Sequence, residues 1–218
     1  MNKQFTFNSY FFSIGLIWLF HISGILGIIY GDTQWFIKAT PINLGLSFLL
    51  VLWQGKNTKN FLSVCLLFFV TGMGAEWLGV QYGLIFGDYT YGAMLGPKLD
   101  GVPWLIGANW VILVACTGRI SQELTQLLWV RAILGTALML FLDVLIEPIA
   151  PILDFWEFES GVAPYQNYFG WAAVAFPLQV VFHYAKVELK GWFFHNLYLL
   201  QLLFFMILLL RLNSLPSL

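Results

Sequence analysis

Residues 61–82 read FLSVCLLFFVTGMGAEWLGVQY, an apolar run in which Glu76 is the single charged residue. A helix needs about 20 predominantly apolar residues to cross the hydrocarbon core of a bilayer. The segment is therefore predicted to span a membrane as a helix. A carboxylate inside such a helix costs about 2.5–3.5 kcal/mol even on the lenient insertion scale. Glu76 is accordingly a candidate functional residue, and a polar helix-packing residue is the alternative.

The composition of the whole chain agrees with a membrane environment. Of its 218 residues, 60% are hydrophobic and 10% are charged, whereas soluble domains carry about 25% charged residues. A soluble fold of this length would expose too much apolar surface, so lipid must cover part of it. The net charge is −1 and the basic residues are scattered. No nucleic-acid partner is expected.

The same length criterion finds seven apolar segments, and no internal repeat divides the chain. We therefore expect one integral membrane domain over residues 1–218, an all-α bundle of about seven transmembrane helices. The expected spans are approximately residues 8–31, 35–53, 61–82, 102–118, 125–147, 165–184 and 192–212. The second contains Lys38 and Pro41, so it is expected to begin near Pro41 and to be short.

Two connectors, residues 83–101 and 148–164, are long and rich in Gly, Pro, Asp and aromatic residues. The first is predicted to fold back as a re-entrant lid over the polar end of the bundle. An ordinary aromatic belt at the membrane interface is the alternative.

Seven spans place the two termini on opposite sides of the membrane. The N-terminal side then collects most of the basic residues, namely Lys3, Lys56, Lys59, Arg119, Arg131, Lys186 and Lys190. The positive-inside rule makes this side cytoplasmic. The opposite side collects most of the acidic residues, namely Asp32, Glu76, Asp88, Asp100, Asp143, Glu147, Asp154, Glu157 and Glu159. Acidic residues carry little topological weight, so function is one candidate cause of their bias.

Asp143 and Glu147 have the i, i+4 spacing that puts two side chains on one helix face. Two close carboxylates in a poor dielectric do not both ionise easily, so the pair would supply a neutral acid and a charged base. A solvated position at the interface is the alternative for Glu147. Two amides, Asn109 within the fourth span and Asn167 at the start of the sixth, could hold water or orient a carboxylate, and each needs a hydrogen-bond partner when buried. Helix–helix hydrogen bonding explains them equally well. His21, in mid-span, is either a site residue or a packing residue.

Four ordered blocks between residues 70 and 175 resemble one known family. They are EWLGVQYGLIFGDYTYG at 76–92, GVPW at 101–104 followed by Asn109 and Trp110, LDVLIEPIAP at 142–151, and PYQNYFGW at 164–171. The family is the membrane carotenoid-biosynthesis group that includes γ-carotene 1′,2′-hydratase and bisanhydrobacterioruberin hydratase.

The resemblance implies a hydratase that adds water to the terminal 1,2 double bond of an acyclic ψ-end group, without a metal or other cofactor. The implied partners are a lycopene- or γ-carotene-like substrate, the lipid bilayer and other carotenoid pathway enzymes. The implied location is a bacterial or archaeal cell membrane.

Our mechanistic hypothesis is protonation of the alkene by a carboxylic acid, followed by water capture of a tertiary carbocation. Asp143 is the first candidate for the acid and Glu76 the second, with Glu147 or Asp154 activating the water. The substrate-binding candidates are Trp77, Tyr89, Tyr91, Trp104, Trp110 and Tyr165, whose aromatic faces would stabilise the cation, together with Asn109 and Asn167.

Three other functions use the same residues. A small transporter or proton-coupled carrier would also need intramembrane carboxylates. A carotenoid end-group cyclase would share the protonation step and then close a ring. A non-catalytic membrane subunit would use the polar residues only for packing.

Overall fold

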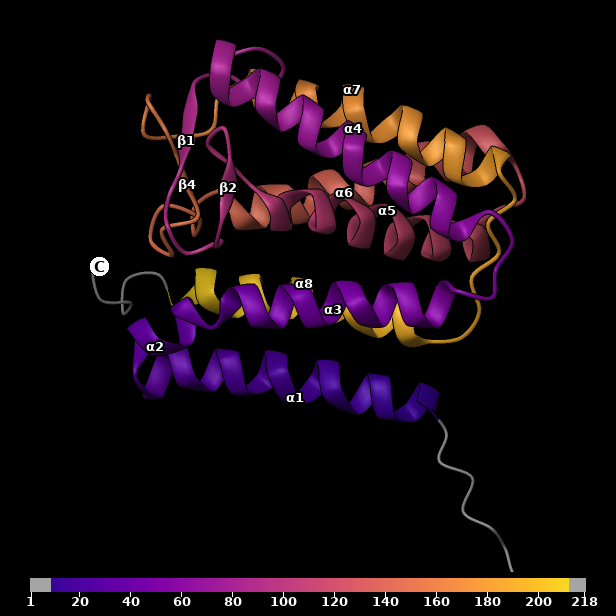
Figure 1. The fold of residues 1–218 in the computed structure, drawn as a ribbon, viewed down its shortest axis with the longest axis horizontal. Helices are drawn as coiled ribbons and strands as arrows, with labels where there is room; N and C mark the ends of the chain where they lie inside the picture. Colours follow the sequence, from indigo (N-terminus) through magenta and orange to yellow (C-terminus); the bar gives the residue numbers. More distant parts are fainter. Residues whose placement is uncertain (1–8, 212–218) are drawn as a thin grey trace, which may run out of the picture.

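The computed structural model describes residues 9–211 as a helical bundle with short strands at one end (Figure 1). The helices are α1 (Ser9–Tyr30), α2 (Thr33–Lys38), α3 (Thr40–Gly55), α4 (Phe61–Tyr82), α5 (Trp104–Leu124), α6 (Leu128–Ile146), α7 (Tyr165–Tyr184) and α8 (Phe193–Leu210). The strands are β1 (Tyr89–Tyr91), β2 (Lys98–Leu99), β3 (Val102–Pro103) and β4 (Trp156–Phe158). Lys3, which entered the count of basic residues, lies outside the described residues.

The observed helices follow the expected spans with two differences. The second span is divided, since α2 ends at Lys38 and α3 begins at Thr40, with Pro41 in its first turn. Proline suits this position because the N–H that it lacks has no partner there in any helix. The fourth expected span is α5, which continues past residue 118 to Leu124; Arg119 and Glu123 form an i, i+4 ion pair on its surface.

Six helical segments of the described chain are long and apolar enough to cross a membrane, with Thr33–Gly55 counted as one. These segments indicate an integral membrane protein. α7 has 20 residues and is absent from the six. Its inward face carries Asn167, Gln179 and His183, all buried, and these lower its hydropathy.

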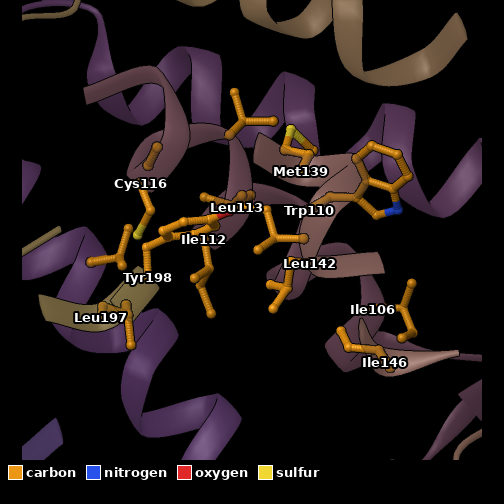
Figure 2. Packing of buried hydrophobic residues seen from close by; sticks show 14 of the residues in the cluster. Ile106, Trp110, Ile112, Leu113, Cys116, Met139, Leu142, Ile146, Leu197 and Tyr198 are labelled. Carbon is orange, nitrogen blue, oxygen red and sulfur yellow. The ribbon is translucent and has the colours of Figure 1, made fainter. Parts of the chain in front are cut away.

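The core is built around α5, the most buried of the six segments. α5 contacts α3, α4, α6, α7 and α8. Figure 2 shows Leu113 and Cys116 of α5 among Met139 of α6 and Leu197 and Tyr198 of α8. In Figure 1, α1, α3 and α8 lie on one side of the bundle, and α4, α6 and α7 lie on the other.

The two long connectors pair with each other to form a cap on one end of the bundle (Figure 1). β1 and β4 are antiparallel, with Tyr89 opposite Phe158 and Tyr91 opposite Trp156. The carboxylate of Asp154 accepts a hydrogen bond from the backbone N–H of Ala93 at 2.8 Å and so ties the connectors together beyond the strands. The first connector thus folds over the bundle end, as a lid was expected to do, but through a strand pairing that the sequence did not indicate.

Gly170 of α7 supports a strained turn of the first connector. Ile85 has φ 69°, and the N–H of Phe86 donates to the carbonyl of Leu84 at 2.8 Å. A positive φ is uncommon for a β-branched residue. A Cβ at position 170 would overlap the carbonyl oxygen of Ile85. Glycine here therefore lets the turn rest on α7 and directs Phe86 into the interior, where it is buried.

We predict that Gly170→Ala destabilises the protein by about 1–3 kcal/mol, the usual cost of overpacking, because the backbone of Ile85 must move. The measurement is thermal unfolding in detergent. Gly74→Ala on α4 is the matched control, since a Cβ there meets nothing within 4 Å. Equal melting temperatures for the two variants would contradict the close contact.

Candidate active site

Glu76 accepts three hydrogen bonds inside the protein. One carboxylate oxygen, Oε2, accepts from the hydroxyls of Tyr89 at 2.5 Å and Tyr91 at 2.7 Å. The other, Oε1, accepts from the indole N–H of Trp110 at 3.0 Å. Glu76 is only 4% exposed, so these donors replace the water that a carboxylate would otherwise require.

The sequence around Glu76 makes room for these donors. Gly72, Glu76 and Gly79 lie on one face of α4, at positions i, i+4 and i+7. A Cβ at Gly72 would overlap Trp110, and a Cβ at Gly79 would overlap the Tyr89 ring. The two glycines therefore bring an indole and a phenol within reach of the carboxylate between them.

Tyr89 and Tyr91 are neutral donors in this arrangement. Burial raises the pKa of each hydroxyl above its usual value, and the charge of nearby Glu76 raises the pKa further. β1 places both rings toward the bundle, because its buried residues alternate with exposed Thr90.

A pair of carboxyls at the end of α6, bridged by Asn167 of α7, lies near this cluster. The side-chain amide of Asn167 donates to Asp143 Oδ2 at 3.0 Å and to Glu147 Oε1 at 3.1 Å. Asp143 and Glu147 thus share one helix face, as their spacing predicts. The indole N–H of Trp156 donates to Glu147 Oε2 at 3.2 Å. Burial raises the pKa of Glu147 to about 7, and the bonds from Trp156 and Asn167 oppose that rise.

A small cavity of about 30 Å³ is lined by the carboxyls of Glu76 on α4 and of Glu147 at the end of α6. A cavity needs about 10–15 Å³ on this measure to hold one water molecule, and the water needs two to four polar partners. The polar groups at this cavity belong to Glu76, Tyr89, Tyr91, Asn109, Trp110, Glu147, Trp156 and Asn167. The space therefore suits one or two water molecules.

A large, mainly apolar pocket of about 400 Å³ adjoins the small cavity. Its walls come from α1, α3, α5, α6 and α8, together with the connectors and α2. Ile106, Asn109 and Trp156 line both spaces. A ligand in the large pocket would therefore meet these three residues at the mouth of the small cavity.

Aromatic rings surround the small cavity. Trp110 and Trp171 stack with ring centroids 4.3 Å apart and an interplanar angle of 18°. Phe86 lies 6.5 Å from Trp110 and 6.3 Å from Trp171. An aromatic face attracts a cation by about 0.5–2 kcal/mol, so this wall favours positive charge.

The structure brings together Glu76, Asp143, Glu147, Tyr89, Tyr91, Asn109, Trp110 and Asn167 from the sequence-predicted set. The other four lie elsewhere. Asp154 holds the cap through Ala93. Trp77 packs edge-on against Tyr82, and Trp104, which is 47% exposed, stacks on Phe69. Tyr165 is 85% exposed.

Sequence reasoning missed five cavity residues, namely Phe86, Ile106, Trp156, Phe158 and Trp171. Trp171 had a usable signal, since it lies four residues after Asn167 and therefore on the same face of α7. Trp156 reaches the site through the pairing of β4 with β1, which no local pattern indicated.

The described residues contain no group of three His, Cys, Asp or Glu side chains placed to bind a metal. His183 contacts Ser121, with 3.2 Å between Nε2 and Oγ, and His195 contacts Glu123 at 2.8 Å. Both pairs lie at the end of the bundle opposite the cap, where α5 ends and α8 begins.

Comparison with known proteins agrees with this geometry. The model of the family described as carotenoid biosynthesis protein matches residues 38–216. Bisanhydrobacterioruberin hydratase from Haloarcula japonica is 32% identical over 112 residues, which cover 45% of this chain and 36% of that relative. The chain therefore matches only about a third of the length of this curated relative. No solved structure matches the chain. Because the family model covers most of the residues, the chain belongs to the carotenoid biosynthesis protein family.

Proposed function

We propose that the protein is a carotenoid hydratase that adds water to the terminal 1,2 double bond of an acyclic ψ-end group. The observation that carries the proposal is the position of the small polar cavity. Glu76 and Glu147 both line it, and it adjoins a large, mainly apolar pocket. The family and the hydratase relative support the same reaction.

The large pocket is the proposed place for the end of the carotenoid. Its volume of about 400 Å³ falls within the usual range for ligand sites, about 300–1,000 Å³. The rest of the long polyene would run between the helices or along the lipid-facing wall. The terminal double bond would then lie beside Ile106, Asn109 and Trp156, which line both spaces.

The Asp143–Glu147 pair is the proposed acid. Two adjacent carboxyls in a poor dielectric hold one proton between them more easily than none. Asp143 lies behind Asn167 and lines neither space, whereas Glu147 lines the small cavity. Glu147 would therefore deliver the proton to the less substituted alkene carbon. The new C–H bond leaves a tertiary carbocation.

Glu76 is the proposed base. Its carboxylate is held by Tyr89, Tyr91 and Trp110 and lines the same small cavity as Glu147. Water attacks the cation, a C–O bond forms, and Glu76 takes the released proton. That proton returns across the cavity to the Asp143–Glu147 pair, so the sum of the steps is the addition of one water molecule.

Asn109 and the aromatic wall have supporting roles in this proposal. Asn109 lines both spaces and makes no side-chain hydrogen bond within the described residues, so its amide is free to hold the attacking water. Trp110 and Trp171 present ring surfaces that would stabilise the cation without reacting with it.

A carotenoid end-group cyclase is the main rival, since it begins with the same protonation. A cyclase must keep water from the cation until the ring closes. A cavity of water-molecule size lined by hydrogen-bonding groups favours water capture.

We predict that Glu76→Gln and Asp143→Asn each lower hydration at least about 100-fold, the lower end of the usual loss when an acid or base is removed. Both amides keep the size of the side chain. The first removes the proposed base, and the second removes the carboxyl that shares the proton with Glu147. The measurement is the carotenoid profile of a lycopene-producing host by mass spectrometry. A hydratase adds the mass of one water, whereas a cyclase leaves the mass unchanged.

Glu157→Gln is the matched control for this series. Glu157 lies on β4 at the same end of the bundle, but its side chain is exposed and lines neither space. We expect this variant to form product at the parent rate. Parent-level product from both Glu76→Gln and Asp143→Asn would overturn the assignment of the carboxyls.

The pH profile provides an independent prediction. An acid acts in its protonated form, and the pKa of Glu147 is about 7. Hydration should therefore fall as the pH rises through about 7, and it should also fall at low pH, where the proposed base Glu76 becomes protonated. Trp156→Phe removes a hydrogen bond that favours ionised Glu147. This variant should raise the pKa and shift the falling limb to higher pH.

The measurement is kcat/KM of the purified protein between pH 5 and 9, a range of about two units on each side of that pKa. Trp129→Phe is the control, because Trp129 is exposed at the start of α6 and stacks on Phe176. A rate that increases through pH 7 would show instead that Glu147 acts as the base.

A further inference from the structure

The large pocket reaches the outer surface of the bundle beside α2 and the first turn of α3. Most of the residues that line it are buried or half-buried. Trp35 of α2 and Ile42 of α3 are the exceptions among these lining residues, since they are 61% and 64% exposed. This place, edged by Trp35 and Ile42, is the α2–α3 opening. Large apolar side chains at its edge suit contact with lipid better than contact with water.

α2 is short, but its contacts hold Trp35 in place at the α2–α3 opening. The carboxylate of Asp32 caps the helix by accepting the backbone N–H of Trp35 at 3.0 Å. The Phe36 ring lies against α1, where a Cβ at Gly27 would overlap it. Trp35 meets the Phe36 ring edge-on, with centroids 4.8 Å apart and an interplanar angle of 77°. An exposed indole is therefore positioned at the edge of an apolar pocket.

The pocket is too small for a whole carotenoid. Its volume of about 400 Å³ suits a small molecule, and a conjugated polyene is too rigid to coil into a compact space. Only the end group fits beside the small cavity, so the remaining chain must leave the protein through the pocket wall. The cap closes one end of the pocket with buried Leu95 and Phe155. The α2–α3 opening is the part of the lining that is both exposed and apolar.

We infer that the α2–α3 opening is the passage through which the polyene chain enters from the membrane and in which it lies during the reaction. This inference rests on the proposed function for the position of the end group. Trp35 provides a flat apolar surface on which a conjugated chain can stack. The opening is at the end of the bundle that carries the strands (Figure 1). The end group therefore enters from the membrane leaflet on the cap side.

An ordinary interface tryptophan is the alternative for Trp35, because indoles gather at membrane–water boundaries. Trp129 provides the comparison, since it is exposed at the start of α6, at the opposite end of the bundle, and lines neither space. A tryptophan that contacts only lipid should affect long and short ligands alike. A tryptophan at the passage should affect only the ligand that is long enough to reach it.

The test therefore compares two ligands that share the reacting end and differ in length. Lycopene has the full polyene chain, and 2,6-dimethylhept-2-ene carries the same terminal double bond on a skeleton that fits inside the pocket. Binding to the purified protein in detergent is measured from the rise in melting temperature with ligand concentration. Hydration of each ligand is measured separately by mass spectrometry. Comparing affinity ratios between proteins cancels the different partitioning of the two ligands into detergent.

The first variant, Ile42→Trp, narrows the opening. Leu49→Trp is the matched control, because Leu49 is exposed on the same face of α3 at position i+7 and lines neither space. We expect Ile42→Trp to weaken lycopene binding about tenfold or more, as overpacking of the passage would. The affinity for the short ligand should remain at the parent value, and Leu49→Trp should change neither affinity.

The second variant, Trp35→Ala, removes the stacking surface and keeps the opening wide. It should weaken lycopene binding about two- to tenfold, the usual value of an aromatic contact, and leave the short ligand unaffected. Trp129→Ala is its control and should bind both ligands like the parent. Trp35 is exposed, so this variant tests the passage even where Ile42→Trp does not fold.

Unchanged lycopene affinity in both variants would overturn the inference. An equal loss for the two ligands would also overturn it, because the substitutions would then act inside the pocket. A parent protein that binds the short ligand but not lycopene would have the same consequence. Lycopene binding that depends on positions 35 and 42, without hydration of either ligand, would support the passage and contradict the hydratase. Hydration of both ligands with no effect at these positions would do the reverse.

Discussion

The structure depends on the requirement that a carboxylate inside a membrane protein be surrounded by hydrogen-bond donors. Glu76 lies in an apolar helix, so its donors must come from other segments. Tyr89 and Tyr91 come from the cap and Trp110 from α5. Much of the local structure around Glu76 follows from this need for donors. The strands hold the tyrosines, and Gly72 and Gly79 remove the side chains that would keep the donors away.

The two sides of the bundle carry different kinds of functional residue. The side with α4, α6 and α7 carries the carboxyls, the shared amide of Asn167 and the stacked indoles. The side with α1, α3 and α8 supplies most of the large pocket and most of its polar side chains. α5 connects them, since Asn109 lines both spaces. In the proposed reaction, the first side provides the acid and the base, and the second side binds the substrate.

The sequence predicted the parts of this arrangement that depend on local rules. Apolar length gave the helices, and the i, i+4 spacing placed Asp143 and Glu147 on one face. Charged and amide residues stood out because burial makes them costly. Aromatic residues were harder to place, because an indole suits a membrane interface as well as a cavity. Trp77 follows Glu76 directly, and a step of one residue turns its side chain about 100° around α4, toward Tyr82.

The rest of the arrangement depends on contacts between distant segments. The strands β1 and β4 have three residues each, and in the sequence α5 and α6 separate them. Strands this short have no local pattern that distinguishes them from loops. The large pocket is equally non-local. Apart from Asn109, its buried polar residues lie on α1, α3 and α8, outside the four sequence blocks that carry the resemblance, and no local pattern groups them.

The pairing of β1 with β4 also orders the biogenesis of the protein. The ribosome releases Tyr89 and Tyr91 soon after Glu76, but their partner strand emerges only after α5 and α6 have been made. During that interval the translocon and nearby lipid must accommodate a carboxylate that lacks its donors. A nascent chain halted between the two strands would hold Glu76 in its most costly environment. Membrane quality control would therefore recognise incomplete copies by the same residue that we propose as the catalytic base.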